Sequence, residues 1–523
     1  MAKFSNKPSL RHTATHPIRT SAQDRVTFEG GRAYSRDQES DLFLLAATNM
    51  VSEDTFYESA DVRDKRFGDL VHAVVAGNPS FIAGDGTDEH AGLARYLRSA
   101  LLMRSASIVM AAEYLAGGGP TPRRVIEGVL QRADEPAEML AYWMGRYGRN
   151  LPMALKRGVA DAVQRLYTQR AAVRYDGADR AMRMGDVIEL VHPDPKDEAQ
   201  SQLFRYLLAT GHKRDEPPVG DQLGLIQTNR AIMALPETTR REFLRDHPDK
   251  FEQAQFSWER LSAWLPGGLD AEAWQGAIPQ MGVMALVRNL RNFDQKGIGE
   301  QAVESVIAKI TDPDEVAKAR LFPYQVWAAY ANAPSDNWKR ALGKTIDLTT
   351  QNIPDLDGTL VVIDTSSSMG AAVSGRSKMS RVEVAAVMAV ATAKRSTDVD
   401  VVIFGSGNAK VDIKGTSVLS GVNKIVGLIG SVGHSTFGHT AIDQHFVPQK
   451  HRRVFLFTDD QMHDAGRVNL DRVPLIYTFN LAGYAPASLE SGRGGRYTLG
   501  GFTDATFTAL KVLEAGKSAR WPF

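Results

Sequence analysis

The chemistry of this sequence is concentrated in one short stretch, VVIDTSSSMG at residues 361–370. Asp364, Ser366 and Ser368 follow an apolar run in a D-x-S-x-S spacing, which can turn one carboxylate and two hydroxyls towards a single point. Hard oxygen atoms gathered around one point suit a divalent cation such as Mg²⁺. An ordinary helix N-cap is the alternative interpretation of the same three residues.

Two later stretches supply further oxygen atoms. FGHTAID (437–443) contains Thr440, and LFTDD (456–460) contains Asp459. Added to the D-x-S-x-S residues, they complete a set of oxygen ligands that water or a partner's carboxylate would extend to an octahedron. The sequence therefore predicts a site for Mg²⁺ or another divalent cation.

Other chemistry suggested by neighbouring motifs has less support. GAAVSGRS (370–377) is similar to a phosphate-binding loop, but Arg376 replaces the lysine and no strand directly precedes it. GSGNAK (405–410) lacks the third glycine of a dinucleotide-binding loop, so a β-turn is expected there. A serine nucleophile at Ser366 or Ser368 lacks the flanks of a nucleophile elbow. We therefore expect no catalytic residue and no enzyme.

A second group of candidates lies earlier, where basic and aromatic residues alternate around residues 146–183. Basic side chains can pair with RNA phosphates, and aromatic faces can stack on bases. A solvated helix face is the alternative interpretation of such a cluster. The predicted RNA-binding residues are Arg149, Lys156, Arg157, Arg165, Arg170, Arg174, Tyr175, Arg180 and Arg183.

The elements that position these residues follow from the apolar pattern. From about residue 36 to residue 332, apolar residues recur at spacings of three and four, as in Leu151, Leu155 and Val159. Breaks rich in Gly and Pro, such as 117–124, would end one helix and begin the next. Paired helices of irregular length favour a stacked helical-repeat array.

The pattern changes after residue 358. The predicted strands are 359–366, 400–406, 452–460 and 473–482, and a predicted helix at 381–395 separates the first two. This alternation indicates a doubly wound, Rossmann-like sheet with parallel strands buried on both faces. Ligands of such sheets bind beyond the carboxyl ends of the strands, which is where the predicted metal ligands lie.

Composition limits the possible functions. The chain has 523 residues and a net charge of +1, so any nucleic-acid surface must be a local patch. The absence of cysteine excludes disulfides, cysteine-ligated zinc and thiol catalysis. No apolar stretch is long enough for a membrane span and the start lacks an apolar signal segment, so a cytoplasmic protein is expected.

The D-x-S-x-S motif, the later threonine and the final aspartate, in this order, resemble the metal-ion-dependent adhesion site of von Willebrand A domains. That family usually has glycine after the last aspartate, where this chain has Asp460. It also has glycine before the threonine, where this chain has His439. Both departures lie beside the ligands and leave the ligands themselves in place.

The whole arrangement, a long helical part followed by such a domain, resembles the Ro autoantigen family, whose helical part is the TROVE domain. The matching blocks are FEGGRAY (28–34), LKRGVADAVQRLY (155–167), MALVRNLRNF (284–293) and ARLFPYQVWAAYA (319–331). The resemblance is to a bacterial member. It implies a ring of HEAT-like antiparallel helical repeats closed by the metal-binding domain.

The resemblance also implies partners. Family members bind Y RNA on the basic outer face of the ring and take single-stranded 3′ ends of misfolded RNA into its centre. Bacterial relatives tether a 3′→5′ exoribonuclease, polynucleotide phosphorylase, through the Y RNA. Lys156, Arg157 and the pair Arg174-Tyr175 fall on family RNA-face positions, whereas Met-Arg-Met at 182–184 stands where the family has Trp-Ser-His.

The sequence thus predicts a flexible basic arm at 1–21, a TROVE domain at 22–353 and a von Willebrand A domain at 354–523. The predicted function is that of a monomeric, non-enzymatic scaffold for noncoding RNA, which assists RNA quality control or decay. A metal-dependent protein–protein adaptor without RNA binding is the alternative. A metal-dependent hydrolase is a third possibility, but no general base stands beside the metal ligands.

Overall fold

The computed structural model describes residues 18–48 without 29, and residues 58–523 without 88–89, 178–179, 212–218, 354–355, 374–378, 397, 493, 501–509, 511–513, 515–520 and 522. Most of the predicted arm, residues 1–21, lies outside this part of the chain. Within the described residues, we find no helix whose length and apolar character would let it cross a membrane.

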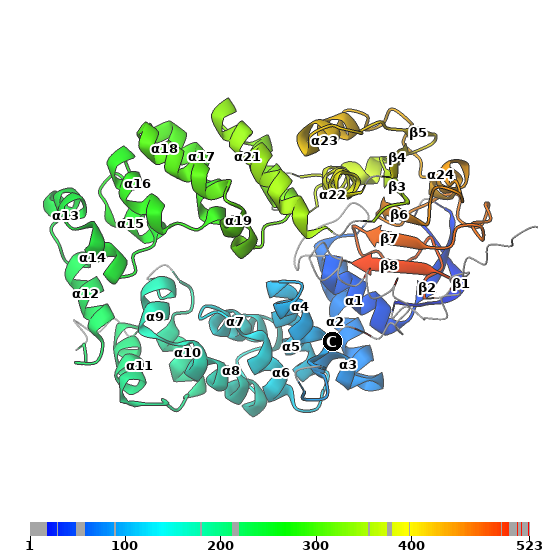
Figure 1. The fold of residues 1–523 in the computed structure, drawn as a ribbon. Coiled ribbons are helices and arrows are strands. Elements are labelled where there is room, and N and C mark those ends of the chain that lie inside the picture. The colour runs from blue at the N-terminus through cyan, green and yellow to red at the C-terminus, as the bar shows by residue number, and fades with distance from the viewer. Residues whose placement is uncertain are drawn as a thin grey trace, which may run out of the picture.

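Helices follow one another around a ring that a sheet domain closes (Figure 1). The first half of the ring contains α1 (Gln38–Thr48), α2 (Ala60–Gly77), α3 (Pro79–Ala83), α4 (Gly92–Ser99), α5 (Arg104–Ala116), α6 (Pro122–Val129), α7 (Glu135–Tyr147), α8 (Met153–Leu166), α9 (Gln169–Tyr175), α10 (Met184–Val191) and α11 (Glu198–Gly211). The second half contains α12 (Gly224–Met233), α13 (Arg240–Asp246), α14 (Pro248–Gln253), α15 (Trp258–Trp264), α16 (Ala271–Ala277), α17 (Val283–Lys296), α18 (Glu300–Ile310), α19 (Pro313–Ala319), α20 (Pro323–Ala331) and α21 (Asp336–Thr349). The predicted helical-repeat ring is confirmed.

The helices form because their apolar residues share one face. In α8, Leu155, Val159 and Val163 are fully buried, as their spacing of four predicts. This face packs on α6 and α10, and α10 in turn packs on α11. The opposite face of α8 is left for polar side chains, and Figure 1 places α8 on the outer side of the ring.

The sheet lies in the second part of the chain. Its strands are β3 (Thr359–Asp364), β4 (Val399–Phe404), β5 (Asn408–Lys410), β6 (Arg453–Thr458), β7 (Ile476–Asn480) and β8 (Arg496–Gly500). Their order is β5-β4-β3-β6-β7-β8, and all neighbours are parallel except β4 and β5. The predicted doubly wound α/β fold is confirmed, and each of the four predicted strands is present; β5 and β8 were not predicted.

Both faces of the sheet are buried. Val361 and Ile363 of β3 face the cluster that contains α22 (Arg381–Arg395) and α23 (Val418–Val426), and this cluster runs on without a break into α13–α21. Leu360 and Val362 face the other side, where α24 (Gly438–His445) packs. Successive residues of a strand point to opposite faces, which explains the continuous apolar run.

An N-terminal hairpin that the sequence did not predict joins the start of the chain to the sheet domain. It consists of β1 (Thr20–Val26) and β2 (Arg32–Arg36), which pair antiparallel. The amide of Tyr34 donates to the carbonyl of Ala487 at 2.7 Å, and Ala487 returns a hydrogen bond at 3.0 Å. The guanidinium of Arg36 forms a buried ion pair with Asp460 directly after β6.

Aromatic residues from the C-terminal end of the chain pack on helices of the first half of the ring. The Trp521 ring lies 4.9 Å from the Phe81 ring and 5.1 Å from the Phe43 ring, measured between centroids. The Phe523 ring lies 5.1 Å from that of Tyr96. These contacts place C-terminal aromatic residues on α1, α3 and α4, so both chain ends contribute to closure of the ring.

Replacing Arg36 by leucine is expected to loosen the hairpin, because it leaves the carboxylate of Asp460 buried without its cation. Removal of one partner of a buried ion pair costs about 3–5 kcal/mol. Hydrogen exchange of the β1 and β2 amides should report this loss of local stability. The matched control is Lys65→Gln in an exposed i,i+4 pair with Asp69, which should cost below about 1 kcal/mol. Equal exchange in both variants would contradict the role given to Arg36.

Candidate functional site

The predicted metal ligands come from the carboxyl ends of two neighbouring strands. Asp364 is the last residue of β3, and Asp459 directly follows β6. The chain runs from β3 to β4 on one side and then crosses to β6 on the other, so these strand ends flank a topological switch point. Ser366 and Ser368 lie in the turn after β3, which continues into a short 3₁₀ helix at Ser367–Gly370.

Hydrogen bonds bring four of the five predicted ligands together. One oxygen of Asp364 accepts from the amide of Ser366 at 2.9 Å, and its other oxygen accepts from the Thr458 hydroxyl at 2.7 Å. The hydroxyl oxygens of Ser366 and Ser368 lie 3.3 Å apart. Arg381 joins Ser368 to Asp459, because its Nη1 atom donates to the carbonyl of Ser368 and to an oxygen of Asp459, each at 3.3 Å.

Thr440, the fifth predicted ligand, lies in the first turn of α24 and is half-buried. Its amide donates to Asp464 at 2.7 Å. Among the described residues, no hydrogen bond joins the Thr440 side chain to the other predicted ligands. Its place in the metal site therefore stays a prediction.

Burial makes ionisation of the two carboxylates, Asp364 and Asp459, depend on a nearby positive charge. Asp364 and Asp459 are both fully buried. Burial and the neighbouring charge of Asp459 raise the pKa of Asp364 to about 7. Burial also raises the pKa of Asp459, and the charge of Arg381 opposes that rise. A cation beside the pair would favour the ionised form of both groups.

The donor set fits a hard divalent cation. It offers two carboxylates and two serine hydroxyls, and one oxygen of Asp459 has no hydrogen-bond partner among the described residues. No group of three or more His, Cys, Asp or Glu in that part of the chain could hold a metal ion. A metal here would therefore be bound partly by hydroxyl oxygens, as Mg²⁺ tolerates and zinc does not prefer.

The structure shows how the chain accommodates its two departures from the von Willebrand A pattern, Asp460 and His439. Asp460, in place of a glycine, has a φ of 71°, a left-handed value that Asp tolerates better than most residues. Its carboxylate accepts from the Ser488 amide at 2.9 Å in addition to its ion pair with Arg36. His439 is the second residue of α24; it is buried, and burial lowers its pKa, so the imidazole is neutral.

Arg381 is the residue of this site that the sequence analysis missed. It is the first residue of α22, where Ser380 and Glu383 form a capping box. Its side chain reaches back to the end of β6 and lies 3.3 Å from an oxygen of Asp459. No motif carried a signal for it, because the contact exists only once α22 packs against the sheet.

The predicted RNA-binding residues divide into two groups. In the first, no side-chain hydrogen bond or ion pair holds the cation within the described residues; these are Arg149, Lys156, Arg157, Arg170 and Arg180. All are exposed except Lys156, which is half-buried. Arg157 shares the outward face of α8 with Asp161 and Gln164, opposite the apolar face.

The second group is engaged within the protein. Arg165 pairs with Glu127 at 2.7 Å, and Arg183 pairs with Asp176 at 2.6 Å. The Tyr175 ring has the guanidinium of Arg174 at 5.5 Å, as well as that of Arg132 at 5.4 Å. Binding of RNA to these residues would have to compete with contacts that already exist, and their predicted role stays untested.

Comparison with known proteins supports the architecture. The family model of the TROVE domain matches residues 250–396. The crystal structure of the RO (RSR) protein of Deinococcus radiodurans superimposes with a TM-score of 0.58 at 18% sequence identity, covering 92% of this chain and 99% of that chain. No curated protein sequence matches significantly. Residues 250–396 thus resemble a TROVE domain, and the chain as a whole has the fold of the Deinococcus protein.

The residues that match the TROVE model extend past residue 358, where the helical pattern of the sequence gives way to alternating strands and helices. The match begins in α14 and ends just after α22, so it includes Asp364, Ser366, Ser368 and Arg381. This range corresponds to the apolar cluster that runs from the second half of the ring into one face of the sheet. The basic segment at 146–183 lies outside the matched residues.

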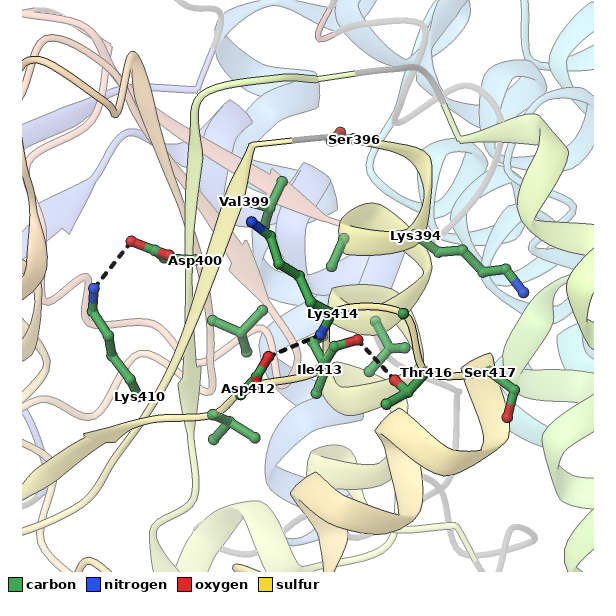
Figure 2. A pocket seen from close by; sticks show the side chains of 15 residues that line it. Lys394, Ser396, Val399, Asp400, Lys410, Asp412, Ile413, Lys414, Thr416 and Ser417 are labelled. Atoms are coloured by element: carbon green, nitrogen blue, oxygen red, sulfur yellow. Dashed lines mark hydrogen bonds and ion pairs between the residues drawn. The ribbon is translucent and has the colours of Figure 1, made fainter.

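A cavity of about 730 Å³ lies away from both sets of candidates, beside β4 and β5 (Figure 2). Its rim carries Lys410 and Lys394, but Lys410 pairs with Asp400 at 3.1 Å and Lys394 pairs with Asp347 at 2.6 Å. Hydrogen bonds from Lys450 and Lys410 lower the pKa of Asp400 to about 2, against the effect of burial. Lys394 and Lys410 are thus both neutralised by carboxylates of the protein.

In the metal-free protein, stability should fall as pH rises from about 4 through about 7. The raised pKa of Asp364 means that the folded state binds this proton more tightly than the unfolded chain does. The stabilisation is complete below the ordinary carboxyl pKa and is lost above the raised one. Unfolding in EDTA at about pH 5 and about pH 8 should show a difference of roughly 2–3 kcal/mol that Asp364→Asn removes. The same pH dependence in both proteins would contradict the shift.

Proposed function

We propose that this protein is a scaffold for noncoding RNA that has no enzymatic activity of its own. The observation that carries the proposal is the group of unengaged cations, Arg149, Lys156, Arg157, Arg170 and Arg180, on a Ro-like ring. Phosphates need cations that are not already neutralised, because each pairing must replace water rather than an internal carboxylate. Arg157, on the outward face of α8, would meet RNA at the outer side of the ring.

We also propose the finer roles that the family resemblance implies. Y RNA would bind the outer side around α8, and the single-stranded 3′ end of a misfolded RNA would enter the ring. A 3′→5′ exoribonuclease such as polynucleotide phosphorylase would act on RNA held there. The support in this chain is the outward position of Arg157. The ion pair of Arg183 with Asp176 weakens the support for a contact at 182–184.

The metal site would serve docking rather than catalysis. Asp364, Ser366, Ser368 and Asp459, with Thr440 as the fifth ligand, would hold Mg²⁺. The ion would supply a positive charge that fixes the two buried carboxylates and accepts an oxygen from a partner. No imidazole or third carboxylate among the described residues is hydrogen-bonded to this set as a general base would be.

Mutation of Lys156, Arg157 and Arg170 to glutamine should weaken RNA binding about tenfold or more. Each lost phosphate contact should also lower the slope of log K against log salt by about 0.7–0.9. Fluorescence anisotropy with a structured RNA that has a single-stranded 3′ tail, at several salt concentrations, measures both effects.

The matched control is Lys339, Arg340 and Lys344 of α21 mutated to glutamine, which removes the same charge from another part of the ring. This variant should bind as the wild type does. Equal weakening by both triple variants would mean a non-specific charge effect. Failure of the wild type to bind any RNA would reject the scaffold and favour the protein–protein adaptor.

Mg²⁺ should stabilise the wild type and leave Asp364→Ala unaffected. A ligand at a hundred times its dissociation constant adds about 2.7 kcal/mol of stability. Thermal unfolding with and without MgCl₂ measures the effect, and Asp471→Ala, which removes an exposed carboxylate of the same domain, is the control. A melting temperature of Asp364→Ala that rises with Mg²⁺ as far as that of the wild type would remove Asp364 from the site.

A further inference from the structure

Arg381 is one of the largest fully buried side chains in the described part of the protein, and it lies inside the candidate metal site. Its Nη1 atom makes three contacts, with a carboxylate oxygen of Asp459 at 3.3 Å, the carbonyl of Ser368 at 3.3 Å and the hydroxyl of Tyr484 at 3.2 Å. Two of these partners belong to predicted metal ligands. Arg381 therefore occupies the surroundings that a metal ion would share.

The contacts of Arg381 leave part of its hydrogen-bonding capacity unused. Its Nε and Nη2 atoms are buried and have no hydrogen-bond partner among the residues that the structure describes, and the same holds for one oxygen of Asp459. A buried arginine with a purely structural role is usually saturated with acceptors, because unpaired buried donors are costly. The explanation that remains is electrostatic: the guanidinium is retained for its charge.

Counting charges shows what the arginine does. Asp364 and Asp459 contribute two negative charges when ionised, and Arg381 contributes one positive charge. The next carboxylate, Asp460, is already compensated by Arg36. With both carboxylates ionised, as metal binding requires, the site has a net charge of −1, whereas the same ligands without Arg381 would have −2.

We propose that Arg381 is a resident counter-charge of this site: it holds the two buried carboxylates in place without a metal and lowers the affinity of the site for a divalent cation. This inference rests on the proposed metal site. Affinity of an oxygen-ligated cation depends on the charge of its ligands, so a site at −1 binds a dication more weakly than one at −2. Arg381 also competes directly for the Asp459 oxygen that it contacts.

A consequence is that a metal-loaded site has one positive charge in excess. Such a site attracts an anionic group from outside, whereas a site without Arg381 would be neutral when loaded. Arg381 thus makes the metal dispensable for folding and makes the loaded site selective for an acidic partner group. Both properties suit a docking point that is occupied only when needed.

Isothermal titration of Mg²⁺ into the full chain, stripped with EDTA and returned to chelator-free buffer, tests the proposal. Arg381→Gln keeps a hydrogen-bonding group and removes the charge, and it should bind Mg²⁺ at least about tenfold more tightly than the wild type, or about 1.4 kcal/mol. Arg381→Lys keeps the charge and should bind as the wild type does. Arg452→Gln, an exposed arginine before the opposite end of β6, is the control.

Thermal unfolding gives a second readout that does not depend on affinity. In EDTA, Arg381→Gln should melt at a lower temperature than the wild type, and Mg²⁺ should restore most of the difference. Mg²⁺ should raise the wild-type melting temperature by a smaller amount. Equal responses of the two proteins would overturn the proposal.

The outcomes separate the inference from the site on which it rests. Tighter binding by Arg381→Gln that is lost when Asp364→Ala is added supports both. Equal binding by the wild type and Arg381→Gln, lost with Asp364→Ala, leaves the metal site standing and rejects the role of Arg381. No binding by any of the proteins rejects both. If Arg381→Gln fails to fold even with Mg²⁺, a wild-type dissociation constant below about 10 μM is still tight enough to contradict a weakened site.

Discussion

Closure of the ring depends on the buried ion pair between Arg36 and Asp460. One end of the helical array continues covalently from α21 into the sheet, whereas the other end is held only by non-covalent contacts. Those contacts include the β1–β2 hairpin, the packing of α1 on β8, the hydrogen bond from Arg66 to the carbonyl of Gly483 at 2.9 Å, and the C-terminal aromatic residues on α1. Separating this pair would leave a buried charge without its partner, which costs several kcal/mol of folding free energy. The pair therefore fixes the position of the N-terminal end of the helical array against the sheet.

The same interface adjoins the candidate metal site. Asp459 and Asp460 are consecutive residues after β6, yet each has a different arginine, Arg381 from α22 and Arg36 from β2. One of these arginines belongs to the sheet domain and the other to the N-terminal hairpin. The loop after β6 therefore contributes both to closure of the ring, through Asp460, and to the candidate metal site, through Asp459. A displacement of either aspartate would move the other, because the two residues are adjacent in the chain.

The basic segment at 146–183 contains both paired and exposed cations. Ion pairs such as Arg165 with Glu127 tie helices together. Other cations of the segment, such as Arg157 and Arg170, are exposed and have no ion pair among the described residues. Exposed Lys and Arg contribute little to folding. Their concentration in one segment of a chain with a net charge of +1 is therefore not required by the fold, which leaves them available for the proposed RNA binding. RNA binding through them would be sensitive to salt for the same reason.

The sequence by itself determined the helices of the ring, the parallel strands and the ligand-bearing strand ends, because burial on one face or on both leaves a local and periodic trace. Tertiary structure alone decided the rest. Six of the seven residues of β1 are exposed, so the hairpin has no apolar alternation to recognise and exists because it docks on the sheet domain. Which cations are free depends on acids far along the chain, as for Arg165, whose partner Glu127 lies in another helix. Arg381 enters the site only when α22 packs against β3 and β4, since contacts between elements are a property of the folded chain and not of residue spacing.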